Sequence, residues 1–225
     1  LRNFDEFRGT SLAQLHRLCP RLSRLELEHG PNIHRSNVVF VALCRSLRVL
    51  NLTAVGASSL VVGVLSGRCS ETGTVLKSPR KPPPLDTLRL RDCYAIGQRS
   101  LQILVQKCRT LRTLDIRNAP RFVNSRAKAV LESIAAAGLP LRELGINHPS
   151  ITTSIFGVLW ICPTIRILRL PNTLGFNRLS RDSPEGRAAR DAVARACPAL
   201  REFYIGDLGH ARREEGWAFN FAGDE

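Results

Sequence analysis

Methionine is absent from this 225-residue sequence, and aromatic residues make up only 6% of it. Long apolar runs are missing as well: the longest candidate, residues 59–67, is far shorter than the roughly 18 residues that a membrane-spanning helix needs. The N-terminus has acidic residues and no hydrophobic region of a signal peptide. The lack of a long apolar run argues against a membrane span, and nothing in the sequence marks secretion or an intact transit peptide. Because no initiator methionine is present, we expect a piece of a longer protein, and the missing part would hold any targeting segment or further domain.

The patterns of common catalytic sites are also missing. The sequence has no phosphate-binding glycine loop, no G-x-S-x-G and no H-E-x-x-H. Its histidines are scattered: His29 and His34 lie near Glu28, but no third ligand follows at a useful spacing, and a surface loop is the better interpretation. We therefore expect neither an enzyme nor a site for a cofactor or metal.

Acidic residues are scarce relative to basic ones. The chain has 33 Lys and Arg against 19 Asp and Glu, a formal charge of +14 and a pI near 10.7. A surplus of this size favours an acidic partner, such as RNA, an anionic lipid surface or an acidic protein face. Charge alone leaves these alternatives open.

The seven cysteines include no C-x-x-C pair and have no histidine at a zinc-like spacing. No neighbouring His or Lys recurs with them to lower a thiol pKa, so we expect reduced thiols that pack as small hydrophobes. Reduced thiols indicate an intracellular compartment, with the cytoplasm favoured, or the mitochondrion if a transit segment is missing. Six of the cysteines end an apolar-periodic segment: Cys19, Cys44, Cys69, Cys108, Cys162 and Cys197.

Most of these cysteines begin a repeated pattern, C-x-x-L-x-x-L-x-L, which occurs in seven recognisable versions. A base period of about 25 residues with insertions fits the spacing of the repeats. The L-x-L core alternates as a strand does, and the stretches between the units carry apolar residues at helical spacing. The anchor hydrophobes, three residues after the cysteine position, are Leu22, Leu47, Leu85, Leu111, Leu141, Ile165 and Leu200.

One strand and one helix cannot bury their apolar faces alone, but stacked units can. The repeat therefore predicts an α/β solenoid of about seven irregular strand-helix units, with a parallel sheet on the concave face and helices outside. The pattern resembles the cysteine-containing class of leucine-rich repeat, found in F-box leucine-rich-repeat proteins and ribonuclease-inhibitor-like folds. The resemblance covers about residues 11–207 and implies a horseshoe. In that class, the third residue after the last strand leucine is often Cys or Asn. Here only Cys93 fits, so the repeats are degenerate.

We expect one domain over residues 1–225. Two insertions interrupt the repeats, at residues 70–84, rich in proline and basic residues, and at residues 172–183. The tail over residues 209–225 falls outside the pattern. Its aromatic residues would cap the open end of the core or dock a neighbouring protein.

Strand residues that flank the leucines face the concave surface, so the chemistry of that surface can be predicted. Its mixture of charges suits a protein ligand better than a phosphate backbone, and the alternative is ordinary solvated charge. The candidate partner-binding residues there are Arg89, Arg91, Asp115, Arg117, Arg169 and Tyr204.

A second candidate surface is a rim of arginines. The residue after the anchor is arginine in five of the seven units, and stacking would line these side chains up to bind RNA phosphates or an acidic protein. Alternatively, their stems cover the apolar edge while their heads bond backbone carbonyls of neighbouring turns. The rim residues are Arg48, Arg112, Arg142, Arg166 and Arg201, with Lys77, Arg80 and Lys81 from the first insertion nearby.

The composition and the missing motifs favour a non-catalytic scaffold or adaptor in a larger intracellular assembly. Its partner would be a protein, with RNA as a further partner through the basic stripe, and we expect no small-molecule substrate. The resemblance implies an alternative: the substrate-recognition region of an F-box ubiquitin-ligase subunit, whose F-box would lie before residue 1.

Overall fold

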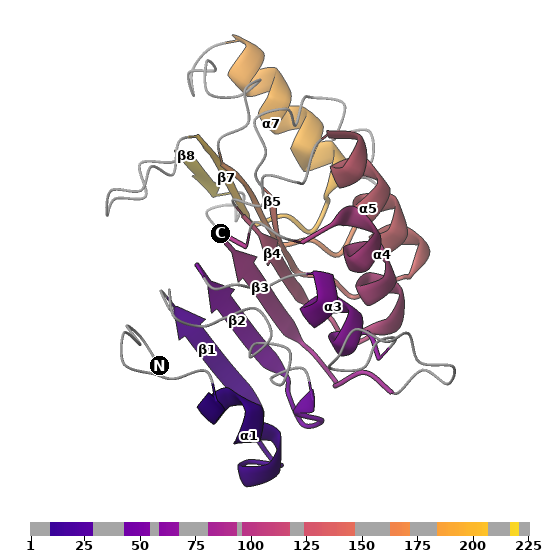
Figure 1. Cartoon of the computed structure of the whole chain (residues 1–225). Coiled ribbons are helices and arrows are strands. Elements are labelled where there is room, and N and C mark those ends of the chain that lie inside the picture. The colour runs from indigo at the N-terminus through magenta and orange to yellow at the C-terminus, as the bar shows by residue number, and fades with distance from the viewer. Residues whose placement is uncertain are drawn as a thin grey trace.

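The computed structural model describes residues 10–28, 43–54, 59–67, 81–93, 96–117, 124–146, 163–171, 184–206 and 217–220. Strands alternate with helices along the chain (Figure 1). The strands are β1 (Arg24–Glu28), β2 (Val49–Thr53), β3 (Thr87–Arg91), β4 (Thr113–Ile116), β5 (Glu143–Ile146), β6 (Ile167–Pro171), β7 (Glu202–Gly206) and β8 (Trp217–Asn220). The helices are α1 (Thr10–Leu18), α3 (Ser59–Leu65), α4 (Gln98–Lys107), α5 (Asn124–Ala136) and α7 (Pro184–Ala196).

The strands form a single sheet in chain order, and β1 to β7 are parallel. The leucine positions of the sequence repeat pair with one another across this sheet, as in Leu25 with Leu50 and Leu114 with Leu144. The prediction of an α/β fold with one parallel sheet is therefore confirmed.

The tail contributes an eighth strand that the repeat pattern did not predict. Strand β8 pairs antiparallel with β7, and Trp217 lies opposite Ile205 in the register. The tail was expected to cap the core or to dock another protein. Its backbone pairs with the last parallel strand, and nothing is described of its side chains.

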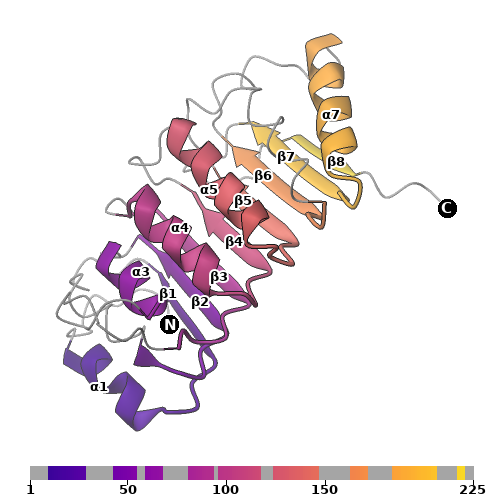
Figure 2. The same ribbon diagram turned by 90° about the vertical axis from the view of Figure 1, so that its right-hand side faces the viewer.

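The helices lie on one face of the sheet (Figure 2), where the apolar residues are buried. Helix α4 shows how the sequence produces this layer: Leu101, Leu104 and Val105 are three and four residues apart and share its buried face. Strand β3 alternates between buried leucines and partly exposed polar residues. A strand with this alternation turns its leucines toward the helices and its polar residues toward the opposite face of the sheet. We call that opposite face the open face.

The cysteine-to-leucine spacing marks the turn that joins a helix to the next strand. In helix α4 the N–H of Cys108 bonds to the carbonyl of Leu104, which continues the helical pattern. The N–H of Leu111 then bonds back to the carbonyl of Cys108 at 3.3 Å, closing the turn. The same closing bond occurs in the units that begin at Cys19, Cys44 and Cys197. The repeated spacing is thus the length of one hydrogen-bonded turn.

The described cysteines are free thiols, and most are buried. Burial raises the pKa of Cys108 to about 12, and burial together with the nearby Cys19 raises that of Cys44 to about 11. Such thiols are poor nucleophiles at neutral pH. The prediction of packed thiols is wrong for Cys19, which is exposed in the first unit, where β1 pairs with β2 alone among the described strands. Cys69 and Cys162 lie outside the described residues.

Candidate functional site

The turns between helices and strands lie along one edge of the sheet, which we call the strand-start edge. Helices α1, α4, α5 and α7 each end a few residues before a strand begins, so the helix C-termini and the strand N-termini meet there (Figure 2). The described segments of this edge are residues 19–23, 44–48, 81–86, 107–112, 138–142, 163–166 and 197–201.

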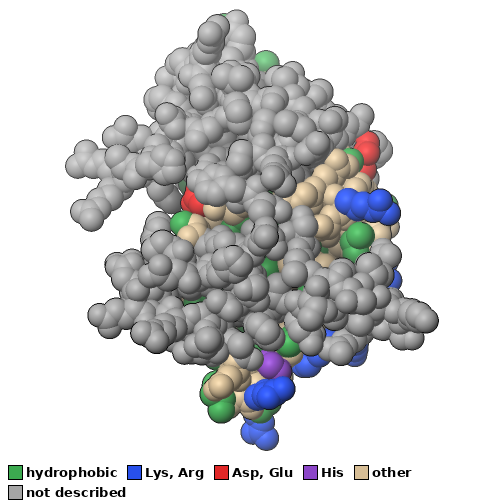
Figure 3. Space-filling model, viewed as in Figure 1, with side chains coloured by type: hydrophobic (Ala, Val, Ile, Leu, Met, Phe, Trp, Pro, Cys, Tyr) green, Lys and Arg blue, Asp and Glu red, His purple; other side chains and the backbone are tan. Residues whose placement is uncertain are grey.

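The charge of this edge is almost entirely of one sign. Asp86 is the one acidic residue in these seven segments. On the face of the molecule seen in Figure 3, the lysine and arginine side chains in view lie at the lower end, near α1, and along the right-hand side. The basic residues of the edge are Arg21, Arg45, Arg48, Lys81, Lys107, Arg109, Arg112, Arg142, Arg166 and Arg201.

Four of the predicted rim arginines follow one another without interruption. The N–H of Arg142 bonds to the carbonyl of Arg112 at 2.7 Å, and the N–H of Arg166 bonds to that of Arg142 at 2.7 Å. Arg201 continues the series with a bond of 2.8 Å to the carbonyl of Arg166. Direct backbone bonds place these residues on adjacent strands, about 4.8 Å apart. We call Arg112, Arg142, Arg166 and Arg201 the arginine column.

The column side chains are exposed, and none has an ion pair with a carboxylate among the residues that the structure describes. Arg48 differs: its guanidinium lies 3.7 Å from the carboxylate of Asp86, which occupies the equivalent position in the next unit. The predicted rim is therefore interrupted at Asp86, and its uninterrupted part is the column.

Two other arginines of the edge bind backbone carbonyls instead. Arg45 donates to the carbonyl of Lys81 at 2.8 Å, and Arg109 donates to the carbonyl of Ala137, just beyond α5. A cation at a helix C-terminus also meets the negative end of the helix dipole. Arg45 and Arg109, which were not among the predicted rim residues, thus bind in the way that the structural alternative expected of the rim. The column arginines make no such bond within the described segments.

A cavity of about 610 Å³ opens on the same edge, before the low-numbered end of the column. Lys81 of the predicted rim lines it, whereas Lys77 and Arg80 lie outside the described residues. The sequence reasoning missed the other cations of this cavity, although two of them stand two residues before an anchor leucine. Its lining consists of Arg45, Lys81, Pro82, Pro83, Pro84, Lys107, Cys108, Arg109 and Thr110.

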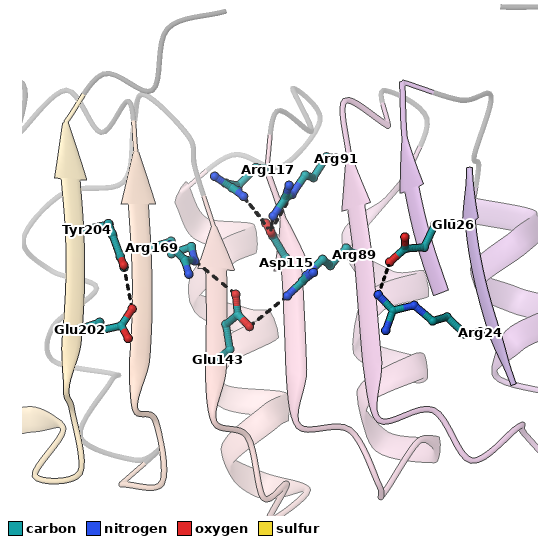
Figure 4. Close-up of polar contacts among 10 residues, drawn as sticks. All are labelled: Arg24, Glu26, Arg89, Arg91, Asp115, Arg117, Glu143, Arg169, Glu202 and Tyr204. Atoms are coloured by element: carbon teal, nitrogen blue, oxygen red, sulfur yellow. Dashed lines mark hydrogen bonds and ion pairs between the residues drawn. The ribbon is translucent and has the colours of Figure 1, made fainter. Parts of the chain in front are cut away.

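The open face of the sheet brings together the other predicted set, but with its charges paired (Figure 4). Asp115 is fully buried between Arg91, at 2.6 Å, and Arg117, at 2.9 Å. Burial alone would raise the pKa of Asp115, but the charges and hydrogen bonds of the two arginines outweigh it and hold that pKa below its usual value. A Cβ on Gly145 would lie 2.6 Å from the Asp115 carboxylate, so this glycine leaves the room that the carboxylate occupies.

A second network crosses the same face from β3 to β7. Glu143 bridges Arg89, at 3.3 Å, and Arg169, at 3.2 Å. The Arg169 guanidinium lies 4.2 Å from the centre of the Tyr204 ring, and the Tyr204 hydroxyl donates to Glu202 at 2.7 Å. The hydrogen bond to Glu202 is the main cause that raises the pKa of Tyr204. The alternation of residues along a strand is enough to predict that Glu143 and Glu202 lie on this face. It does not predict which side chains they contact.

The described residues contain no group of three His, Cys, Asp or Glu side chains arranged to hold a metal ion. Among the helices of the described segments, none combines the length and the apolar character that crossing a membrane requires. A search of protein-family models gives no match, and a search of curated protein sequences gives none either. The function is therefore inferred from the residues and their geometry.

Proposed function

We propose that this protein is a non-catalytic scaffold of the leucine-rich-repeat type that binds an anionic macromolecular partner along its strand-start edge. The observation that carries the proposal is the arginine column. Its four guanidinium groups are exposed, lie on adjacent strands and form no ion pair with a carboxylate of the described residues. The in-register leucines and the recurring cysteine turn support the repeat type. Free buried thiols support a reducing compartment, with the cytoplasm favoured.

The column is difficult to explain as a stabilising feature of the fold. Two unit charges at this spacing repel by about 1 kcal/mol in water, less when the side chains splay apart. The C-termini of α1, α4, α5 and α7 point to the edge, but each helix dipole supplies only about half a negative charge. Together they offset about two charges, well below the surplus of the edge. A polyanion would remove this repulsion and add charge-assisted hydrogen bonds.

Arginine at all four positions also fits this role. A guanidinium offers a planar fork of donors that matches a carboxylate or a phosphate at two points, whereas lysine offers a point charge. Four such forks in a row provide a repeated contact for a partner with repeated negative groups. The open face lacks this property, because its arginines are already bonded to Asp115 and Glu143.

The test measures binding of fluorescent poly-glutamate and of a single-stranded oligouridylate by anisotropy, at about 50 and about 150 mM salt. Replacing Arg112, Arg142 and Arg166 with glutamine should weaken the binding of at least one probe roughly tenfold or more. The control replaces Arg99 and Arg187, which are exposed near the starts of α4 and α7 and so lie away from the edge; the pair Arg142→Gln with Arg166→Gln removes the same charge from the column. The proposal fails if neither probe binds, or if these two double variants lose affinity equally.

A further inference from the structure

The spacing of the column discriminates between kinds of anionic partner. Four arginines on adjacent strands span about 14 Å, measured across the strands. Carboxylates on successive turns of an α-helix, at 5.4 Å per turn, span about 16 Å over four positions. Side chains on one face of an extended peptide, about 6.7 Å apart, span about 20 Å. The span of the helix exceeds that of the column by about 2 Å, which flexible arginine side chains can reach. The span of the extended peptide exceeds it by about 6 Å, which requires much larger shifts of the side chains.

The residue types of the edge disfavour single-stranded nucleic acid. The described segments of the strand-start edge contain no Phe, Tyr or Trp on which bases could stack, and no Asn or Gln to bond base edges. Single-strand binders combine a basic groove with such aromatic platforms. RNA would therefore be held here by its phosphates alone.

Apolar rings accompany the column on the same edge. Pro140, Pro163 and Pro198 lie one or two residues before the anchors of three column units, and all three are exposed. Rigid apolar surface beside arginines suits a partner that carries apolar and acidic side chains on adjoining faces. A phosphate backbone has no apolar side chains that could pack against this surface.

We infer that the partner of the arginine column is an acidic protein helix that lies across the strands and presents one carboxylate per turn to Arg112, Arg142, Arg166 and Arg201. This inference rests on the proposed function and narrows it to one class of partner. The low-numbered end of such a helix site is set by Asp86, whose carboxylate would repel a further acidic residue in line with the column.

The test uses two helical peptides of identical composition, each of about 20 residues, with helicity matched by circular dichroism. One has glutamates at i, i+4, i+7 and i+11, which share a face; the other has the same glutamates spread around the helix. We expect the first to bind the full chain about tenfold more tightly at about 150 mM salt. Equal binding of the two peptides overturns the inference, as does tighter binding of an oligouridylate of equal charge. Either result leaves the proposed function standing, provided that the binding depends on the column.

A pair of matched variants locates the contact. Arg142→Gln with Arg166→Gln should weaken the one-face peptide roughly tenfold. Arg99→Gln with Arg187→Gln, exposed near the starts of α4 and α7, removes the same charge and should change affinity less than about twofold. Equal losses in the two variants would mean that only net charge attracts the peptide, which overturns the assigned contact.

Discussion

The open sheet face and the strand-start edge are both rich in arginine, yet their electrostatics are opposite. On the open face, Arg89, Arg91, Arg117 and Arg169 each lie within 3.3 Å of a carboxylate. In the arginine column, no described carboxylate accompanies any of the four guanidinium groups. A count of arginines therefore does not locate a binding surface; the position of the carboxylates decides which arginines are available.

The difference arises from where each acidic residue falls in the repeat. Asp115 and Glu143 occupy alternate strand positions, where side chains of neighbouring strands meet on the open face. At the column position the one acidic residue is Asp86, and Arg48 pairs with it. The open-face arginines are thus paired within the fold, whereas the column arginines have no carboxylate partner among the described residues.

The largest expected effect concerns Asp115. Asp115→Asn leaves Arg91 and Arg117 side by side without their carboxylate, which should lower the free energy of unfolding by about 3 kcal/mol. Chemical denaturation measures the change. Asp86→Asn is the control, because its partner Arg48 is exposed, and should cost no more than about 1 kcal/mol. Equal losses would contradict the contrast between the two regions.

Acid provides an independent check on the same residue. Because the folded-state pKa of Asp115 is lowered, its contribution is present above the ordinary pKa of aspartate, about 3.9. It is lost as the pH falls through the lower, folded-state value. The wild type should therefore lose more stability than Asp115→Asn below about pH 4. Parallel pH profiles would show that Asp115 is not ionised between the arginines.

An intermediate effect is expected at Gly145. In Gly145→Ala the new Cβ would meet the Asp115 carboxylate, so the carboxylate or the strand must shift, at a cost of about 1–3 kcal/mol. Thermal unfolding of the single and double variants measures it. The cost should fall in an Asp115→Ala background, where the obstacle is gone. An additive double variant would show that the two residues do not interact.

The smallest effect on stability is expected in the column. Arg142→Gln with Arg166→Gln removes like-charge repulsion and breaks no ion pair among the described residues, so the free energy of unfolding should change by no more than about 0.5 kcal/mol, or rise slightly. Arg117→Gln is the matched comparison, because it removes a partner of buried Asp115 and should be clearly destabilising. A large loss from the column variant would mean that those arginines stabilise the fold.

The strands were predictable from the sequence because one local turn sets their spacing. The bond from Leu111 to Cys108 has a counterpart in the described units that begin at Cys19, Cys44 and Cys197, and counting residues along the repeat located β1 to β7 and their leucines. The column was predictable for the same reason, since the residue after the anchor always enters the strand at the same level.

The pairing of charges was not predictable, since it depends on distances across strands. Arg89 on β3 reaches past β4 to Glu143 on β5, a contact between residues 54 apart in sequence. The packing of Asp115 against Gly145 likewise requires the register of two units. Strand β8 was missed because it lies outside the repeat and runs against it.

The backbone bonds along the strand-start edge are independent of the side chains beside them. The first units carry serine, arginine and aspartate at the column position, at residues 23, 48 and 86, and the linking bonds from Arg48 to Ser23 and from Asp86 to Arg48 are both 2.8 Å. The spacing of the edge is therefore the same whether the residue at the column position is neutral, basic or acidic. A substitution at one column position would change the charge at that position alone, and the backbone bonds would keep the distance between units.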